Sequence, residues 1–333
     1  MTNGSDGSPR RGVRAHPVAD LVLRRTIIGC LTLIAVSALI FGATQVLPGN
    51  AATALLGRNA TPAKVASLTE ELRLDDSVPT QYLTWFRRAL TADLGTSFTT
   101  NSSVGGDLRR RAANSFWLVL FATVGGSLLG CGLGLLCAVN AGRRVDRWLP
   151  PAFLSVTAVP EFVVGVGLVM LFAALVFHIL PAVSFVPPGE HVFANPAILV
   201  LPTLTLTIVI TPYIFRITRA AVTDALNSDY VEMAELKGLS SRRVLFWHAL
   251  PNSVAPIAQV IGLNLLYLAG GIVAVEYVFN YPGLGQGLDM AVSNRDIPTI
   301  QAIVLLLAVF YIAVNIATDA VALAASPRRR LGA

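Results

Sequence analysis

The sequence predicts an all-α polytopic membrane protein with six transmembrane helices. Of its 333 residues, 54% are hydrophobic and only 13% are charged, which is too little polarity to cover the surface of a water-soluble protein. The apolar residues fall into separate runs that are long enough to cross a bilayer as helices. The net charge of +6 comes from basic residues at the ends of these runs. This pattern is typical of membrane orientation signals and argues against a nucleic-acid partner.

The N-terminal part begins with a polar tail and continues into the first span. Residues 1–20 are rich in Gly, Ser and Arg and predict a flexible cytoplasmic tail. The apolar run that follows predicts a first transmembrane span at 21–47. A signal peptide also has a basic start and an apolar middle, but this run is long enough to cross the bilayer and no clear small-residue cleavage site follows it.

Residues 48–112 predict an extracytoplasmic loop that contains two helices, near 61–75 and 80–90. The loop includes several arginines, but long loops largely escape the positive-inside rule, so the short loops decide the topology. Four apolar residues at helical spacing indicate that the loop packs against its own spans. These residues are Leu68, Leu72, Leu83 and Phe86.

The transmembrane core, 113–325, contains the other five predicted spans. They are expected at about 113–139, 149–177 with an interruption at Pro160, 196–220, 254–279 and 299–325. Gly126, Gly130 and Gly134 share one face of the second span and allow another helix to approach closely.

The short loops orient these spans. The loop 140–148 carries three arginines against one aspartate, whereas 178–195 has no Lys or Arg. The positive-inside rule therefore places the first loop in the cytoplasm and the second outside. Residues 280–298 are then an outer loop and 326–333 a basic cytoplasmic tail, so both termini are cytoplasmic.

A polar segment at 226–252 lies between the fourth and fifth spans, on the cytoplasmic side. Asp229 and Glu232 predict the start of a short helix by a capping-box pattern. Gly238 predicts a left-handed end to this helix, with Leu239 folding back over it. A second helix is expected from Ser240 or Ser241 to Pro251. Its first turn contains two arginines, which the helix dipole disfavours there.

No motif predicts catalysis or a bound cofactor on this chain. The sequence has no phosphate-binding loop, no zinc-protease motif and no nucleophile elbow. Cys30, Cys131 and Cys137 lie in apolar runs and indicate neither a disulfide framework nor a metal site. If ATP drives this protein, another polypeptide must hydrolyse it.

Several polar residues within the predicted spans are candidates for a translocation pathway. For Glu161, which follows Pro160, a pathway role and a role in breaking the helix are equally favoured. Tyr311 and Asn315 share a helix face with Asp319, and hydrogen bonding between helices is the favoured interpretation of this stripe. Asn264 and Glu276 in the fifth span are comparable.

Stretches spread along the chain resemble one family of transport proteins. Glu232-Met233-Ala234, Gly238 and Leu250-Pro251 resemble the EAA-type loop of binding-protein-dependent ABC transporter permeases. The fuller resemblance is to the dipeptide/oligopeptide/nickel permeases, in the subunit with a long first outer loop. Its supporting stretches are Leu47-Pro48-Gly49, Asp93-Leu94-Gly95-Thr96-Ser97-Phe98, Asp229-Tyr230-Val231, Lys237-Gly238-Leu239, His248-Ala249-Leu250, Tyr281-Pro282-Gly283-Leu284-Gly285 and Asn294-Arg295-Asp296. Asn50, Met233 and Ser326 depart from the family pattern.

The resemblance implies a multi-pass subunit of a heteromeric importer in the bacterial cytoplasmic (inner) membrane. Its expected partners are a second homologous permease subunit, two ATP-binding subunits that hold ATP and Mg, and an extracytoplasmic substrate-binding protein. The long outer loop is a candidate contact for that binding protein. The cytoplasmic coupling helix between spans 4 and 5 would dock the ATPase through Glu232, Met233, Ala234, Lys237, Gly238, Leu239, Arg242 and His248.

The expected function is therefore to form half of the translocation pathway of an ATP-driven importer for peptides. The same architecture could instead carry nickel chelates or another small solute. An ion-coupled secondary transporter is less favoured because the two halves show no convincing repeat. A membrane-embedded enzyme is less favoured because no cluster of catalytic residues is visible.

Overall fold

The structure is a computed structural model that describes residues 17–46, 61–63, 66, 69, 76–187 and 190–325. The tail expected at 326–333, the first sixteen residues and most of the helix expected near 61–75 lie outside the described residues. Residues 17–20 already belong to the first helix, so the N-terminal tail ends earlier than expected.

The described residues are almost entirely helical. Their secondary structure is α1 Pro17–Val46, α4 Val78–Leu90, α5 Val104–Val139, α6 Arg144–Thr157, α7 Glu161–Val169, the π-helical turn η2 Met170–Leu175, the 3₁₀ turn η3 Val192–Ala194, α8 Ala197–Leu226, α9 Asp229–Leu236, α10 Ser241–Val244, the π-helical turn η4 Leu245–Ala249, α11 Leu250–Val278, α12 Leu284–Ser293 and α13 Ile297–Ala325. Five helical segments, in α1, α5, α8, α10–α11 and α13, are long and apolar enough to cross a membrane.

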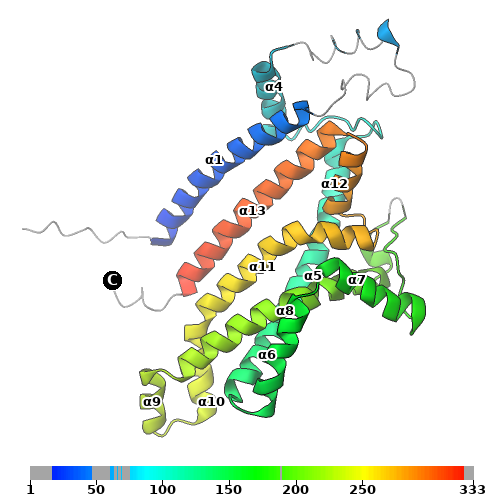
Figure 1. Cartoon of the computed structure of the whole chain (residues 1–333). Helices are drawn as coiled ribbons and strands as arrows, with labels where there is room; N and C mark the ends of the chain where they lie inside the picture. The colour runs from blue at the N-terminus through cyan, green and yellow to red at the C-terminus, as the bar shows by residue number, and fades with distance from the viewer. Residues whose placement is uncertain are drawn as a thin grey trace, which may run out of the picture.

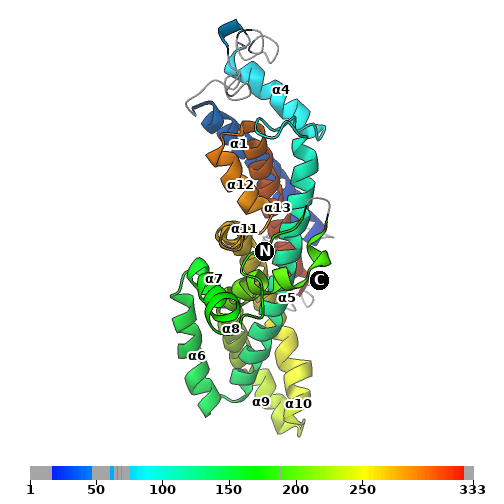
Figure 2. The same cartoon turned by 90° about the vertical axis from the view of Figure 1, so that its right-hand side faces the viewer.

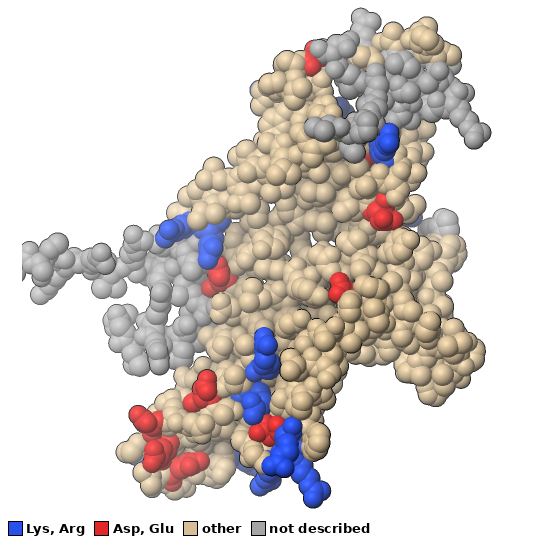
Figure 3. Space-filling model, viewed as in Figure 1, with Lys and Arg blue, Asp and Glu red and all other residues tan. Residues whose placement is uncertain are grey.

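The long helices α1, α13, α11 and α8 lie side by side (Figure 1), and α5 packs along α8. Both views place α9 and α10 at one end of the molecule and α4 and α12 toward the other (Figures 1 and 2). Charged residues in Figure 3 gather mainly at the lower end, over α9 and α10, with smaller groups at the left edge and the upper right, and much of the remaining surface is uncharged. This distribution suits a protein that crosses a bilayer.

The glycine face of α5 meets α8, as the four-residue spacing predicts. Gly126, Gly130 and Gly134 are all buried. A Cβ atom at Gly130 would overlap the side chain of Ile214, and one at Gly134 would overlap the backbone of Phe215. The close approach of α5 and α8 therefore depends on these glycines, and the prediction of a helix–helix contact is confirmed.

The third predicted span is broken. Helices α6 and α7 meet at an angle of 98°, so the described part of the chain contains six spans only if this bent pair counts as one. Pro160 has an extended backbone, with ψ of 145°, and its missing N–H cannot continue the helix. The interruption at Pro160 was expected, but its extent was not. The expected loop 140–148 is also shorter, because α6 begins at Arg144.

Two other predicted boundaries and one predicted loop need correction. Helix α5 begins at Val104 rather than at 113, and α8 continues to Leu226, past the expected end at 220. The outer loop expected at 280–298 contains α12, which the sequence reasoning missed. Short apolar helices that lie across the ends of longer ones have too few turns to give a clear periodic signal.

Helix α4 packs on α1 through aromatic residues. The ring of Phe41 lies 5.5 Å from that of Tyr82 and 5.6 Å from that of Trp85, measured between centroids. Ser37 shares a hydrogen bond of 2.8 Å with the Tyr82 hydroxyl. The expected packing of this loop on its own spans is present, but Leu83 does not take part because it is exposed.

Candidate functional site

Helix α9 begins and ends with defined backbone geometry. Its N-cap is Ser228, so Asp229 is the first helical residue and not the cap, which corrects the prediction. Its C-terminus follows the expectation closely. Gly238 has φ of 81°, its N–H donates to the Glu235 carbonyl, and the Leu239 N–H donates to the Ala234 carbonyl. This pair of bonds is the Schellman motif.

One face of α9 is buried against the next helical segment. Val231 and Ala234 pack with Val244 of α10, and Leu239 covers the same small cluster. Leu239 therefore folds back over the helix end, as predicted. The burial of Ala234 also places it beneath the exposed surface of α9. Its small side chain sets how closely α9 approaches α10.

The opposite face of α9 is open. Its apolar members include Met233, which is 54% exposed, and Leu236, which is 75% exposed. The acidic residues Glu232 and Glu235 are exposed beside them, and acidic groups gather over α9 at the lower left of Figure 3. A short helix that carries large exposed apolar side chains among acids has the character of a protein contact surface.

The residues that follow α9 form the start of a long helix. Lys237 and Arg242 are exposed, and His248 is half-buried in η4. Residues Ser241–Val278 make one helical span of 38 residues, so the second helix of the predicted hairpin and the fifth predicted span are one element. Within it, η4 is a π-helical turn, and Trp247 there is 76% exposed.

Glu276 and α12 form a buried polar site at the opposite end of α11. Glu276 is 0% exposed and accepts hydrogen bonds from Ser115 at 2.6 Å, from the N–H of Gly285 at 2.7 Å and from the N–H of Gln286 at 3.1 Å. The last two are N–H groups in the first turn of α12, whose N-cap, Gly283, has no side chain to bind them. Glu276 therefore caps α12 from another helix and lies inside the subunit, not on a channel surface.

The other predicted pathway residues lie on three helices, α7, α11 and α13. Asn264 is buried and donates to the Val260 carbonyl of its own helix at 2.8 Å. Tyr311 is exposed, and Asn315 donates to its carbonyl at 3.0 Å. The structure therefore does not bring the α13 residues together with Asn264 or Glu161.

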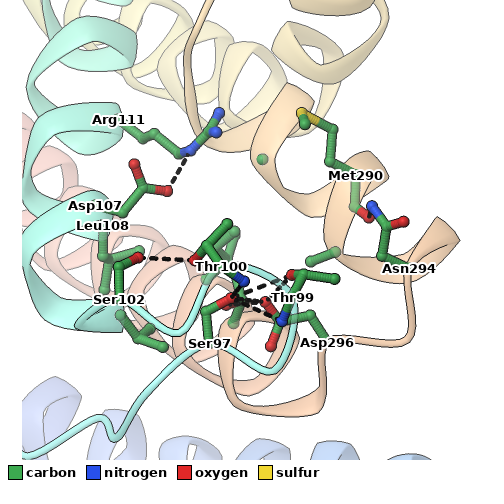
Figure 4. A pocket seen from close by; sticks show the side chains of 15 residues that line it. Ser97, Thr99, Thr100, Ser102, Asp107, Leu108, Arg111, Met290, Asn294 and Asp296 are labelled. Carbon is green, nitrogen blue, oxygen red and sulfur yellow. Dashed lines mark hydrogen bonds and ion pairs between the residues drawn. The ribbon is translucent and has the colours of Figure 1, made fainter. Parts of the chain in front are cut away.

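Asp296 forms a second polar cluster, which joins α13 to the segment after α4. The carboxylate accepts from the hydroxyls of Ser97 at 2.5 Å and Thr99 at 2.9 Å, and from the N–H of Phe98 at 3.0 Å. Thr299 donates to it at 2.8 Å. The cluster borders a cavity of about 120 Å³ (Figure 4).

The same cavity reaches Asp107 and Arg111 on α5. Arg111 donates to Asp107 at 2.7 Å and to the Gly283 carbonyl of the α12 region at 3.2 Å. The carboxylates of Asp107 and Asp296 are thus both occupied by neighbouring donors. The cavity therefore lies where α5, α12 and α13 meet.

A larger groove lies between α8 and α11. Its volume is about 450 Å³, and its polar lining residues are Tyr213, Arg216, Gln259, Asn264 and Tyr267. Tyr267 donates to Glu161 of α7 at 3.3 Å, so two predicted pathway residues are found here: Asn264 in the lining and Glu161 beside it. No sequence signal grouped these residues, because they come from three helices and follow no motif.

Comparison with known proteins places the chain in a family. Residues 130–331 match the family described as binding-protein-dependent transport system inner membrane component, and residues 18–116 match its N-terminal family. The "probable peptide ABC transporter permease protein y4tP" of Sinorhizobium fredii is 33% identical over 309 residues, which cover 93% of this chain and 98% of that one. The "glutathione transport system permease protein GsiC" of Pectobacterium atrosepticum is 32% identical, over 90% of this chain and 95% of that one.

A solved structure shares the fold. In the structure titled "Inward facing conformations of the MetNI methionine ABC transporter", one chain matches with a TM-score of 0.54 and 16% identity, over 66% of this chain and 96% of that one. Its likeness concerns the helical architecture alone. The family matches and the relatives together cover almost the whole described chain. The chain therefore belongs to the family of inner membrane components of binding-protein-dependent transport systems.

Proposed function

We propose that this chain is the permease subunit of an ATP-driven ABC importer and forms half of a translocation pathway for peptides. The family supports the transport role. The relatives support the substrate class, because one is named for peptides and another for glutathione, itself a small peptide. A bacterial inner membrane location follows from the family and from the five apolar helices.

In this proposal the α9 end of the molecule and both termini face the cytoplasm. Arg143, Arg144 and Arg147 lie in or next to the short connection between α5 and α6, which the positive-inside rule assigns to the cytoplasm. The start of α1 and the end of α13 lie together, joined by the 2.8 Å ion pair between Arg25 and Asp319. The positions of the arginines and the order of the helices therefore both support a topology with the α9 end and both termini in the cytoplasm.

The open face of α9 is the proposed docking surface for an ATP-binding subunit. The observation that carries this is the exposure of Met233 and Leu236 on a helix whose other face is fixed to α10. A helix held by a buried cluster and a Schellman end moves with its neighbour as one body. Closure of the ATP-binding subunits, which hold ATP and Mg, would therefore displace α9 and α10 together.

Two further partners complete the proposed importer. A second, homologous permease subunit forms the other half of the pathway. A substrate-binding protein docks at the opposite end, where α4, α12 and the segment 93–103 lie. The Asp296 cluster supports this assignment because it fixes 97–99 against α13 and so presents a rigid surface.

The test is ATP-dependent peptide uptake by the complete reconstituted complex, with two glycine variants compared. Gly238→Asp should abolish most uptake while the complex still assembles, because it places a charge and a side chain at the end of α9. Gly142→Asp is the matched control, since Gly142 also has a left-handed backbone, with φ of 77°, and an added Cβ there meets nothing within 4 Å. Normal uptake by the Gly238→Asp complex would refute the docking surface, and uptake without ATP would refute the importer.

A further inference from the structure

Two arginines near the end of α8 have different surroundings. Arg219 is paired with Asp146 of α6 at 2.5 Å. Arg216, three residues earlier, lies in the groove between α8 and α11. It is exposed, and the residues that the structure describes provide it with neither a carboxylate nor a hydrogen-bond acceptor. The groove thus presents a free guanidinium.

The position of Arg216 does not suit contact with lipid chains. It lies on α8 three residues before Arg219, whose partner Asp146 is in the first turn of α6, next to the proposed cytoplasmic connection between α5 and α6. An arginine inside a bilayer faces a cavity, water or a partner, because burial of its charge in hydrocarbon is costly. Its groove neighbours Gln259 and Asn264 are also polar, while Ile217, Pro256, Val260 and Leu263 give the groove a largely apolar lining. The polar groups are therefore few and set apart along the groove.

The groove offers groups that match a peptide. One side-chain N–H of Asn264 donates to the Val260 carbonyl, and its side-chain oxygen is able to accept. The rings of Tyr213 and Tyr267 are 6.3 Å apart between centroids and bridge α8 and α11. At the Tyr267 end lies the carboxylate of Glu161, whereas Arg216 is three residues, about 4.5 Å of rise, beyond Tyr213 along α8.

We propose that Arg216 binds the C-terminal carboxylate of the peptide as it passes between α8 and α11. A guanidinium holds a carboxylate with two parallel hydrogen bonds, which gives direction as well as affinity. Glu161 at the other end of the groove faces the peptide's ammonium group. The proposal rests on the peptide-importer function above. It adds that Arg216 recognises the negative charge of the substrate within this subunit.

The experiment compares uptake of trialanine and trialanine amide by the complete complex in proteoliposomes. Arg216→Gln should lower the ratio of free-acid to amide uptake by about tenfold, and Arg216→Lys should restore part of it. Arg147→Gln, which removes another exposed cation, should leave the ratio unchanged. Any preference of the binding protein for the free acid is the same in every complex and cancels when ratios are compared.

The outcomes separate the inference from the function on which it rests. If the unsubstituted complex moves neither peptide with ATP, the peptide-importer function fails and the inference falls with it. If that complex transports but Arg216→Gln changes both peptides equally, or neither, only the inference is overturned. If the Arg216→Gln complex purifies without its second permease subunit, the inference is also overturned, because the groove would then be an interface between the two permeases.

Discussion

Replacement of Glu276 tests how α12 is held on the membrane helices. In Glu276→Ala, three donors lose their acceptor: the Ser115 hydroxyl and the N–H groups of Gly285 and Gln286. A buried donor without a partner costs about 1–3 kcal/mol. The free energy of opening α12 should therefore fall by about 3 kcal/mol or more.

Glu276→Gln should lower the free energy of opening α12 by less than Glu276→Ala does, because glutamine keeps one of the two acceptor oxygens. Both backbone N–H groups bind one carboxylate oxygen, Oε2, which a glutamine can reproduce. The other oxygen, which accepts from Ser115, becomes an NH₂ group that can only donate. Ser115 already accepts from the N–H of Leu284 at 2.8 Å and can accept a second donor. Only the Ser115 proton loses its partner, so we expect a loss of about 1–2 kcal/mol.

The assay is hydrogen–deuterium exchange of the α12 amides in the purified complex. A loss of 3 kcal/mol corresponds to about a hundredfold faster exchange in Glu276→Ala, with Glu276→Gln between it and the unsubstituted protein. Asp289→Asn is the control, because Asp289 is an exposed carboxylate on α12 itself. Unchanged α12 exchange in Glu276→Ala, or an equal effect of Asp289→Asn, would refute the assignment of Glu276 as the cap of α12.

Three further substitutions test other contacts. In Gly130→Leu, the new side chain should overlap Ile214 and destabilise the α5–α8 contact by about 1–3 kcal/mol. The melting temperature of the purified complex should fall, and an unchanged melting temperature would contradict close packing there. Asp296→Ala should speed amide exchange of residues 97–103, because several donors lose their acceptor, and slow exchange would show that the segment is held by other contacts. Tyr82→Ala should weaken the packing of α4 on α1 by about 1 kcal/mol and increase proteolysis near α4, whereas resistance equal to that of the unsubstituted protein would contradict this role of the ring.

The spans were predictable because membrane insertion demands long apolar helices, which leave a clear signal in sequence. The end of α9 was predictable because a left-handed residue after a helix favours glycine, and Gly238 has that conformation. The start of α9 was not, because Ser228 and Asp229 are both acceptable caps and local sequence cannot choose between them.

Contacts between distant segments could not be derived from local patterns. The stretches around Ser97 and Asp296 each belonged to the family resemblance, but their mutual hydrogen bonds link residues 199 positions apart. Likewise, a Cβ atom at Gly283 would overlap the Glu276 carboxylate, and one at Gly285 would overlap the backbone of Val273. A carboxylate that caps a helix from another element has no fixed spacing in sequence, so the sequence suggested for Glu276 only a pathway role or hydrogen bonding between helices.

The long helix that contains α10, η4 and α11 joins the two ends of the subunit. Val244 near its start packs against Val231 and Ala234 of α9, and Glu276 near its end caps α12. A helix of 38 residues is about 57 Å long and bends mainly where its hydrogen-bond pattern is interrupted, which here is at the π-helical turn η4 and at Pro256 within α11. A displacement of α9 by an ATP-binding subunit would therefore either move the whole element or be absorbed at one of these two positions. Both lie in the part of the element closer to α9 than to Glu276, so the proposed coupling motion can be adjusted there without disturbing the cap of α12.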